Sequence, residues 1–295
     1  MSLSRTSRTF RTSLAASLGA VLVLAAAACA PQPQSTATAA TTTSGNCATS
    51  PSLHQQGQLT VATDSPAYSP WFDNNDPSDG KGFESAVAYA VAGKLGFAQN
   101  QVKWVVEPFD SSYAPGPKTF DFDINQISST PERAKTVDFS TSYYTANQAV
   151  LVLAKSKYAG ATSLAELKGA KIGVQVATTS YQAVLDEIKP GQQPSVFNTT
   201  NDEVNALQNG QVDALVTDLP TVFYLAGAQV QGGKILGQFN YDGGTPEQFG
   251  LLLGKGSGFT PCVNQALAAL KADGTLDKIT SQWLSASADA PELKP

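Results

Sequence analysis

Short apolar segments alternate with amphipathic segments over most of the chain that follows residue 58. The apolar, β-branched segments predict strands at 59–63, 101–106, 147–155, 171–177, 212–217 and 249–253. Apolar residues at helical spacing predict helices at 83–95, 181–188, 202–209, 260–270 and 276–284. The alternation of the two patterns predicts an α/β protein with largely parallel sheets.

The segment from 120 to 144 carries the most distinctive pattern. Residues 120–125 alternate apolar and acidic or amide side chains, which predicts a strand with one buried face. Hydroxyl residues follow at 128–130, and a Pro-Glu-Arg sequence that ends in Arg133 begins a helix. Hydroxyls, backbone N–H groups at a helix start and a guanidinium together suit a carboxylate. The alternative is a surface loop whose arginine pairs with Glu132 or Asp138.

A second strand ends in the same way, because the hydroxyl-rich turn 178–180 follows residues 171–177 and begins a helix. Acidic residues follow two other strands at Asp64 and Asp218. Ligands of α/β folds bind at such carboxyl ends of strands. These two acids and Glu84 could be paired carboxylates for general acid–base catalysis, or they could hold an ammonium group. The residues alone leave both interpretations open.

The first 28 residues have the pattern of an export signal. Three arginines precede an apolar run, 14–28, that ends in small residues directly before Cys29. This ending resembles a bacterial lipoprotein box and predicts lipid attachment at Cys29. The run is short and alanine-rich for a membrane span, so a retained helix is less favoured. Residues 29–46 contain no charge and are rich in Pro, Gln, Ser, Thr and Ala, which predicts a flexible tether.

The net charge narrows the possible partners. The chain has 19 basic and 24 acidic residues, for a net charge of −5. Removal of residues 1–28 removes three arginines and no acid, which leaves 16 basic residues and a net charge of −8. An acidic exported protein is poorly suited to nucleic acid or anionic lipid surfaces. We therefore expect no nucleic-acid partner, and membrane contact only through the lipid anchor.

Cysteine and histidine usage limits the chemistry further. Cys47 and Cys262 are the only cysteines after the tether, and an exported chain favours a disulfide between them over a metal site. His54 is the only histidine. No Ser–His or Cys–His nucleophile and no histidine metal site can therefore be assembled in the folded part. We expect no catalytic residue, no metal and no cofactor.

Six segments in order resemble the polar-amino-acid (family 3) extracellular solute-binding proteins of ABC importers. They are LTVATD (59–64), GFESAVAYAVAGKLG (82–96), TPERAKTVDFSTSYY (130–144), KIGVQVATTS (171–180), VDALVTD (212–218) and LKADGTLDKITSQWL (270–284). The resemblance covers about residues 57–286. It implies the type II periplasmic-binding fold, in which two lobes, each a mixed β-sheet flanked by helices, are joined by two hinge strands. In this family the lobes close over a free amino acid like a Venus flytrap.

The domain boundaries follow from this topology, because the strands near 150 and 250 bracket the second lobe. We predict a signal peptide at 1–28, a lipid-anchored tether at 29–46, lobe 1 at 47–147 and 248–295, and lobe 2 at 148–247.

The resemblance also implies roles for individual residues. Arg133 matches the arginine that grips the ligand carboxylate, and Ser128 matches a hydroxyl beside it. Thr179, next to Thr178 in the second hydroxyl turn, matches the residue that reaches the same carboxylate from the other lobe. Asp218 matches the acid that holds the α-ammonium group.

The remaining predicted positions concern the ligand side chain. Tyr68 and Phe109 match aromatic residues that enclose it. Further ligand contacts are expected at Asp64, Asn125, Gln126 and Gln175, with Trp71 and Glu84 as additional selectivity positions. The alternative for the aromatic residues is core packing, and for Glu84 it is an acid at a helix start. The sequence departs from the family pattern at Gln126 and Ala177, where glycine is usual, and in the proline-rich segment 113–118, which replaces a regular helix.

We therefore expect a monomeric receptor that captures a polar amino acid, with an uncharged or cationic side chain favoured, and delivers it to an ABC permease. It would lie outside the cytoplasm, anchored to the outer face of the cell membrane by lipid on Cys29. Two alternatives stay open: a dehydratase-like enzyme on the same fold, and a ligand-sensing subunit of a membrane receptor.

Overall fold

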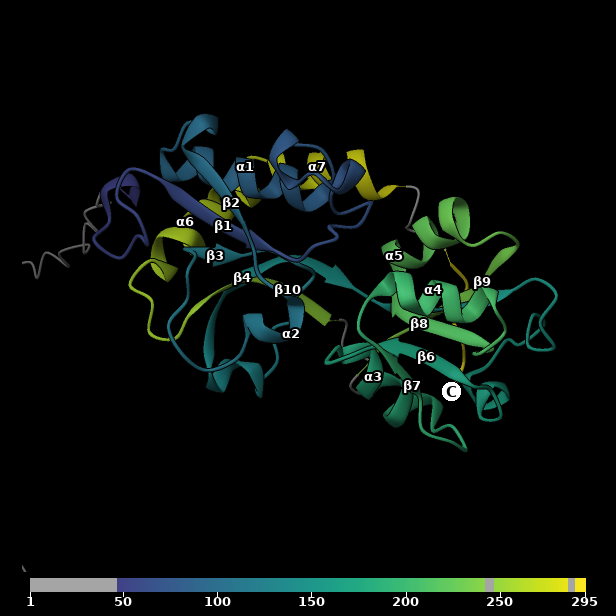
Figure 1. Ribbon diagram of the computed structural model, residues 1–295. Helices are drawn as coiled ribbons and strands as arrows, with labels where there is room; N and C mark the ends of the chain where they lie inside the picture. The colour runs from purple at the N-terminus through teal and green to yellow at the C-terminus, as the bar shows by residue number, and fades with distance from the viewer. Residues whose placement is uncertain (1–46, 242–246, 286–289) are drawn as a thin grey trace, which may run out of the picture. The chain divides into compact units, whose positions relative to one another are not determined.

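The computed structural model describes residues 47–241, 247–285 and 290–295 (Figure 1). The predicted signal peptide 1–28, the lipidation at Cys29 and the tether 29–46 lie outside the described residues. The described chain forms two five-stranded mixed sheets, each flanked by helices, which confirms the predicted α/β class. None of the helices within the described ranges combines the length and the apolar composition that a membrane crossing requires.

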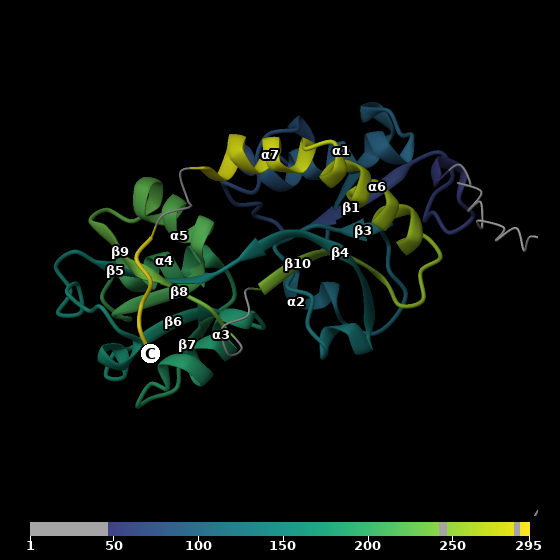
Figure 2. The same ribbon diagram turned by 180° about the vertical axis from the view of Figure 1, so that it is seen from behind.

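The first sheet has the strand order β2-β1-β3-β10-β4. Its strands are β1 (Leu59–Thr63), β2 (Val102–Val106), β3 (Phe122–Asp123), β4 (Val137–Ala146) and β10 (Glu247–Gly254). The helices α1 (Phe83–Leu95), α6 (Thr260–Ala272) and α7 (Thr275–Leu284) cover one face, as both views show (Figures 1 and 2). The short helix α2 (Phe109–Ser112) packs on the other face, where Phe109 joins Ile127 and Leu252 in a second apolar cluster.

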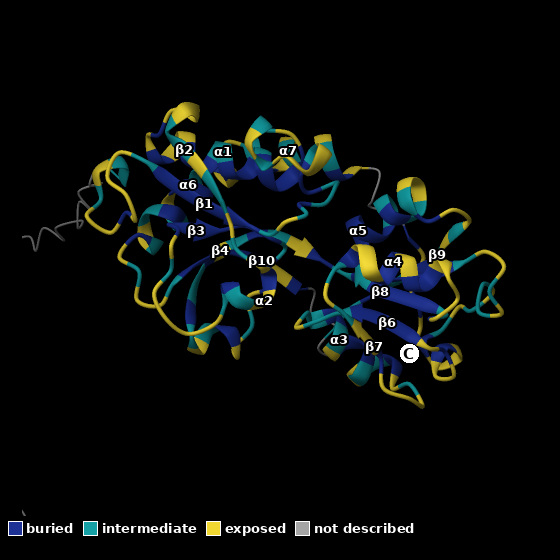
Figure 3. Cartoon of the chain, in the orientation of Figure 1, coloured by how far each residue is buried: buried dark blue, intermediate teal, exposed yellow. Residues whose placement is uncertain are grey.

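The second sheet has the order β7-β6-β8-β5-β9. Its strands are β5 (Gln148–Leu153), β6 (Ile172–Gln175), β7 (Ser195–Phe197), β8 (Ala214–Asp218) and β9 (Gly233–Phe239). Helices α4 (Thr200–Gln208) and α5 (Leu219–Tyr224) cover one face, and α3 (Thr179–Ala183) covers the other. Leu151 of β5 packs toward the first face and its neighbour Val150 toward the second, so both faces of the strand are buried. Its neighbour β8 is drawn mostly in the colour of buried residues (Figure 3).

Strand direction confirms the mixed sheets that the family resemblance implied, and it differs from the largely parallel sheets that the alternation of patterns alone predicted. β5 runs antiparallel to β8 and β9, and β10 runs antiparallel to β3 and β4. The parallel pairs are confined to the strands that helices connect. The C-terminal residues, which we assigned to lobe 1, reach the second sheet: Glu292 pairs with Gln238, and Leu293 lies in the core beside Val150.

The alternating segment 120–125 is buried on both sides, which corrects the prediction of a single buried face. Phe122 and Ile124 pack under α1, but Asp121 is also only 5% exposed and Asp123 is fully buried. The reason is the position of β3, which lies between β1 and β10 in the middle of the sheet. Asp121 accepts hydrogen bonds from two backbone N–H groups, those of His54 and Thr60, both at 2.6 Å.

The predicted disulfide is present between Cys47 and Cys262, whose Cα atoms lie 5.9 Å apart. It joins the first described residue to helix α6 across a sequence separation of 215 residues. Because α6 packs against α1, the bond fixes the start of the folded chain to the helical face of the first sheet.

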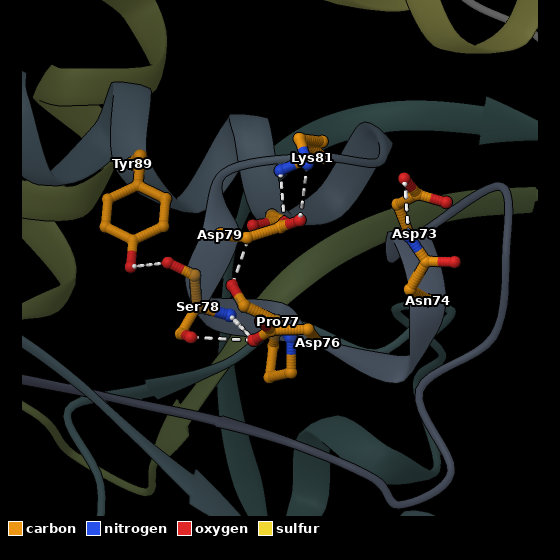
Figure 4. A network of polar contacts seen from close by, with 9 residues as sticks. Asp73, Asn74, Asp76, Pro77, Ser78, Asp79, Lys81 and Tyr89 are labelled. Carbon is orange, nitrogen blue, oxygen red and sulfur yellow. Dashed lines mark hydrogen bonds and ion pairs between the residues drawn. The ribbon is translucent and has the colours of Figure 1, made fainter.

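A polar loop precedes helix α1 and fixes its start (Figure 4). Asp76 accepts hydrogen bonds from the backbone N–H of Ser78 at 2.9 Å and from its hydroxyl at 2.6 Å. Asp79 accepts from the N–H of Lys81 at 2.8 Å, and the hydroxyl of Tyr89 in α1 donates to the carbonyl of Ser78. These bonds tie residues 76–81 to one another and to helix α1.

Candidate functional site

A pocket lies where loops from both sheets meet. Most of its lining comes from segments at the carboxyl ends of β1, β3, β6 and β8. The lining residues are Asp64, Pro66, Tyr68, Phe109, Asn125, Gln126, Gln175, Thr178, Thr179, Ser180, Thr200, Thr217, Asp218 and Thr221. Hydroxyl, amide and carboxyl groups dominate this set, so the pocket suits a small polar ligand.

Nine of the residues predicted to contact a ligand line this pocket. They are Asp64, Tyr68, Phe109, Asn125, Gln126, Gln175, Thr178, Thr179 and Asp218. Ser128 and Arg133 lie next to the lining: the Ser128 hydroxyl is 3.5 Å from that of Thr179, and Arg133 bonds to the carbonyl of Ala177. Their role in ligand binding stays a prediction.

Arg133 belongs to a single 3-10 turn, Arg133–Lys135, rather than to the longer helix that the sequence suggested. Thr130 still begins the turn, because its hydroxyl oxygen accepts the Arg133 N–H at 3.2 Å. The guanidinium donates to the carbonyl of Ser128 at 2.8 Å and to that of Ala177 at 3.0 Å. It lies 4.7 Å from the ring centroid of Tyr113, and it is 8% exposed. Burial lowers the pKa of Arg133 from its usual value.

The alternative interpretation of Arg133 as a partner of a nearby acid is wrong. Glu132 pairs with Lys135 at 2.5 Å, and Asp138 pairs with Lys255 at 3.0 Å. The guanidinium instead has carbonyl oxygens as its hydrogen-bond acceptors, from a loop of each sheet. Within the described ranges Arg133 forms no ion pair, although the charges of Glu247 and Asp218 act on it. A bound anion in direct contact would further offset the cost of burying this cation.

The second hydroxyl turn splits its two threonines between different tasks. Thr178 caps helix α3 by accepting the N–H of Tyr181, and its hydroxyl donates to the carbonyl of Gln175 at 2.8 Å. The Thr179 hydroxyl donates to the side chain of Glu247 at 2.7 Å. Thr178 therefore holds the turn in place, and Thr179 presents a donor to a carboxylate.

Asp218, at the end of β8, supplies the negative side of the pocket. Its carboxylate accepts a hydrogen bond from the Gln148 amide at 2.9 Å. Burial and the neighbouring charge of Glu247 hold the pKa of Asp218 well above its usual range. Asp64, on the opposite sheet, has a pKa raised chiefly by burial, although backbone N–H groups of Ser65 and Phe109 oppose the shift.

Two residues predicted as selectivity positions lie outside the pocket lining. Trp71 is fully buried in the core of the first sheet, where its ring contacts Phe83, Tyr144 and Phe249. This is the core-packing alternative, with one addition: the indole N–H donates to the hydroxyl of Thr221, a pocket residue, at 2.9 Å.

Glu84, the other such residue, is fully buried behind Gln126. Its carboxylate accepts the backbone N–H of Gln126 at 2.7 Å, the Gln126 amide and the hydroxyl of Tyr143. Burial raises the pKa of Glu84 from 4.5 to about 7. Glu84 therefore positions Gln126, whose backbone has φ 48°, and does not itself line the pocket.

This pKa predicts a pH dependence of stability. The folded carboxyl of Glu84 binds its proton more tightly than the unfolded one, so its contribution to stability decreases as the pH rises from 4.5 to about 7. A shift of this size corresponds to about 3 kcal/mol. We expect Glu84→Gln to remove this part of the pH dependence in urea unfolding measured between pH 4 and 8. Parallel curves for the variant and the unaltered chain would contradict the assignment.

Sequence reasoning missed several residues of the site. Pro66, Thr200 and Thr221 line the pocket but carry no charge and lie outside the motifs that we used. Ser180 and Thr217 also line it; they lie inside the motifs 171–180 and 212–218 but were not singled out as ligand contacts. Gln148 and Glu247 were missed because they begin strands that we interpreted only as apolar segments. Gln148 and Glu247 could have been found as polar residues at the start of otherwise apolar strands.

Two mixed sheets flanked by helices, with a polar pocket built from both, define a two-lobed periplasmic binding protein of type II. An ancestral arginine-binding protein bound to glutamine has this fold, with a TM-score of 0.65 and 33% identity over 78% of this chain and 99% of that chain. The ancestral amino-acid-binding protein AncCDT-1, described as a precursor of cyclohexadienyl dehydratase, matches with a TM-score of 0.63 and 31% identity over 77% and 95%.

Sequence comparison identifies the family. The model of the bacterial extracellular solute-binding proteins, family 3, matches residues 59–286, and the chain belongs to this family. The ABC transporter arginine-binding protein 1 of Escherichia coli (strain K12) is 32% identical over 212 residues, which cover 68% of this chain and 81% of that protein. The L-cystine-binding protein TcyA of Bacillus subtilis (strain 168) is 30% identical over 236 residues, 79% and 83% of the two chains.

Proposed function

We propose that this protein captures a free polar amino acid in the pocket between the two sheets and delivers it to an ABC permease. The observation that carries the proposal is the distribution of charge around the pocket. A guanidinium and the Ser128 hydroxyl lie next to the pocket lining, and the Thr179 hydroxyl and an acid that ends β8 belong to it. A zwitterion carries the complementary pair of charges in one small group.

The carboxylate of the ligand is assigned to Arg133, Ser128 and Thr179. The hydroxyls of Ser128 and Thr179 come from different sheets and lie 3.5 Å apart, so one carboxylate oxygen can accept from both. The guanidinium of Arg133 lies at the carbonyl of Ala177, two residues before Thr179. Charge-assisted bonds of this kind contribute roughly 1.5–3 kcal/mol each.

The α-ammonium group is assigned to Asp218, and this assignment predicts a pH-dependent affinity. The pKa of free Asp218 is raised, and a bound ammonium favours its charged form, so ligand binding releases a proton. The affinity should therefore fall, by up to about tenfold per pH unit, as the pH decreases below the pKa of the free form. Calorimetry over a pH series, in buffers of different ionisation enthalpy, measures both effects. Asp218→Asn should abolish the proton release, and a release that persists in this variant would contradict the assignment.

The side chain of the ligand is assigned to the part of the pocket lined by Asp64, Tyr68 and Asn125. The Asn125 amide nitrogen has no hydrogen-bond partner within the described ranges, and it is buried. The carboxyl of Asp64 suits a cationic group or an amide N–H of the ligand, and the Asn125 amide can donate to an amide oxygen. The names of relatives support this class, since they refer to arginine, cystine and glutamine.

A thermal-shift screen against the twenty amino acids tests the proposal. A ligand at one hundred times its dissociation constant stabilises the folded state by about 2.7 kcal/mol, so selective binding gives a clear shift. Cystine is added to the screen as a further compound. We expect arginine, glutamine or cystine to be among the ligands. If no polar amino acid stabilises the protein, the proposal fails.

Relatives named as transport binding proteins support a binding role without catalysis. The alternative is a dehydratase-like enzyme, because one structural neighbour is described as a precursor of cyclohexadienyl dehydratase. Mass spectrometry of the ligand after incubation separates the two, since a receptor returns its ligand unchanged.

The location of the protein follows the same proposal. The family is extracellular by description, and we assign the anchor to lipid on Cys29 and the spacer to residues 29–46 because of their sequence pattern. The protein would work as a monomer, with the permease as its membrane partner.

A further inference from the structure

Glu247 is a buried acid inside the proposed binding site, and no sequence motif points to it. It is the first residue of β10 and is 8% exposed. One of its carboxylate oxygens, Oε2, accepts hydrogen bonds from the hydroxyl of Ser128 and from that of Thr179, the latter at 2.7 Å. Its other oxygen accepts from the amide of Gln148 at 2.8 Å.

The two hydroxyls are those assigned above to the ligand carboxylate. A serine or threonine hydroxyl has a single proton to donate. Neither hydroxyl can therefore donate to Glu247 and to a ligand at the same time. Glu247 has the same chemical group as the ligand, and in the free protein it already occupies the position between Ser128 and Thr179.

Glu247 engages only part of the proposed carboxylate site. The guanidinium of Arg133 bonds to the carbonyls of Ser128 and Ala177 and not to Glu247. On the opposite side, the Gln148 amide donates to both Glu247 and Asp218, at 2.8 and 2.9 Å. Glu247 thus occupies the two hydroxyl donors of the proposed carboxylate site. It does not bond to the guanidinium of Arg133.

We propose that Glu247 is an internal competitor for the carboxylate of the ligand. It holds the hydroxyls of Ser128 and Thr179 in the free protein, and an amino acid must displace it to bind. This inference rests on the proposed function, because it requires the same hydroxyls to bind the ligand. If so, Glu247 lowers the affinity of the protein for any ligand that binds these hydroxyls through the ligand's own carboxylate.

Three variants separate occupancy of the hydroxyls from simple charge repulsion. Glu247→Asp keeps the negative charge but shortens the side chain by one methylene, so that it no longer reaches both hydroxyls. Glu247→Gln keeps the length and removes the charge. Glu292→Gln is the matched control, since Glu292 is exposed and lies outside the pocket lining.

The probes are amino acids paired with the amines that lack their α-carboxylate groups; cystamine lacks both carboxylates of cystine. The pairs are L-arginine with agmatine, L-cystine with cystamine, and L-glutamine with 4-aminobutanamide. Calorimetry measures the affinity of each folded variant for both members of one pair, the pair whose amino acid binds in the thermal-shift screen. We expect about a tenfold higher amino-acid affinity, equal to about 1.4 kcal/mol, in both Glu247→Asp and Glu247→Gln. The amine affinity should not rise in either variant, and Glu292→Gln should stay within about twofold for both probes.

Each other result is informative. An unchanged or lower amino-acid affinity in Glu247→Asp overturns the inference, and a gain only in Glu247→Gln assigns the effect to charge repulsion and also overturns it. An equal gain for the amine contradicts it as well. If the unaltered protein binds no amino acid, the proposed function itself fails.

Discussion

Replacement of Arg133 by alanine should reduce amino-acid affinity by a hundredfold or more. The guanidinium is 8% exposed and is the cation assigned to the ligand carboxylate. Without it the bound carboxylate would remain in a site from which water is largely excluded, with only hydroxyl donors. Removal of one partner of a buried ion pair costs about 3–5 kcal/mol, because the remaining charge is uncompensated. Calorimetry with the amino acid found in the screen measures the loss.

Two further variants show whether the loss belongs to the guanidinium. Arg133→Lys keeps the charge but loses the planar fork, so we expect an intermediate affinity. Lys135→Ala removes an exposed cation from the same turn and should leave binding unchanged, since Lys135 pairs only with Glu132 among the acids of the described chain. Circular dichroism checks that each variant is folded. Affinity within threefold of the unaltered protein in Arg133→Ala would remove Arg133 from the site.

The periodicity of apolar residues predicted the helices and strands that pack a continuous apolar face against one core. Helix α1 has the bounds that the sequence indicated, and β1 matches its apolar segment, because each has a continuous apolar face toward one core. The strand β4 was missed, although it has ten residues. Its residues Ser140 to Thr145 are mostly polar, and several interact across the sheet rather than with an apolar core: Ser140 accepts the N–H of Leu251, and Thr145 bonds to Gln248.

The departures from the family pattern have a physical meaning in the structure. Gln126 and Ala177 stand where the family usually has glycine, and both adopt left-handed backbone conformations, with φ of 48° and 62°. A glycine reaches this conformation at low cost, so its replacement must be stabilised by contacts. Gln126 has such contacts with Glu84, and the carbonyl of Ala177 accepts from Arg133 and Tyr113.

Tertiary contacts decided the parts of the site that sequence could not indicate. Trp71 and Tyr68 are both aromatic residues in one proline-rich loop, yet Trp71 lies in the core and Tyr68 in the pocket lining. Glu84 lies in the first turn of α1, as the alternative expected, but it is buried, and its contacts with Gln126 and Tyr143 also give it a supporting position behind the pocket lining. Such differences depend on which side chains meet across the sheet, and a pattern along one segment does not contain them.

Removal of the disulfide should destabilise the protein strongly, although the bond lies outside the proposed site. The bond closes a loop with a sequence separation of 215 residues, and the loss of chain entropy in the unfolded state scales with the logarithm of that length. This relation gives a contribution of up to about 5 kcal/mol, a large fraction of the stability of a typical protein. We expect the double variant Cys47→Ala, Cys262→Ala to unfold at lower urea concentration by an amount that corresponds to about 3–5 kcal/mol.

Restriction of the unfolded chain by the disulfide predicts a second measurable effect, in addition to the change in the midpoint of urea unfolding. Because the bond restricts the unfolded chain, its removal should let that chain expand and should increase the denaturant dependence of unfolding, the m value. The unaltered protein in reducing buffer should match the double variant, and the double variant should not respond to the reductant. Equal stability in oxidising and reducing buffer, with the thiols shown to be free, would contradict the prediction. A midpoint that falls without an increase in m would place the effect in the folded state, at the contact between the first folded residues and α6.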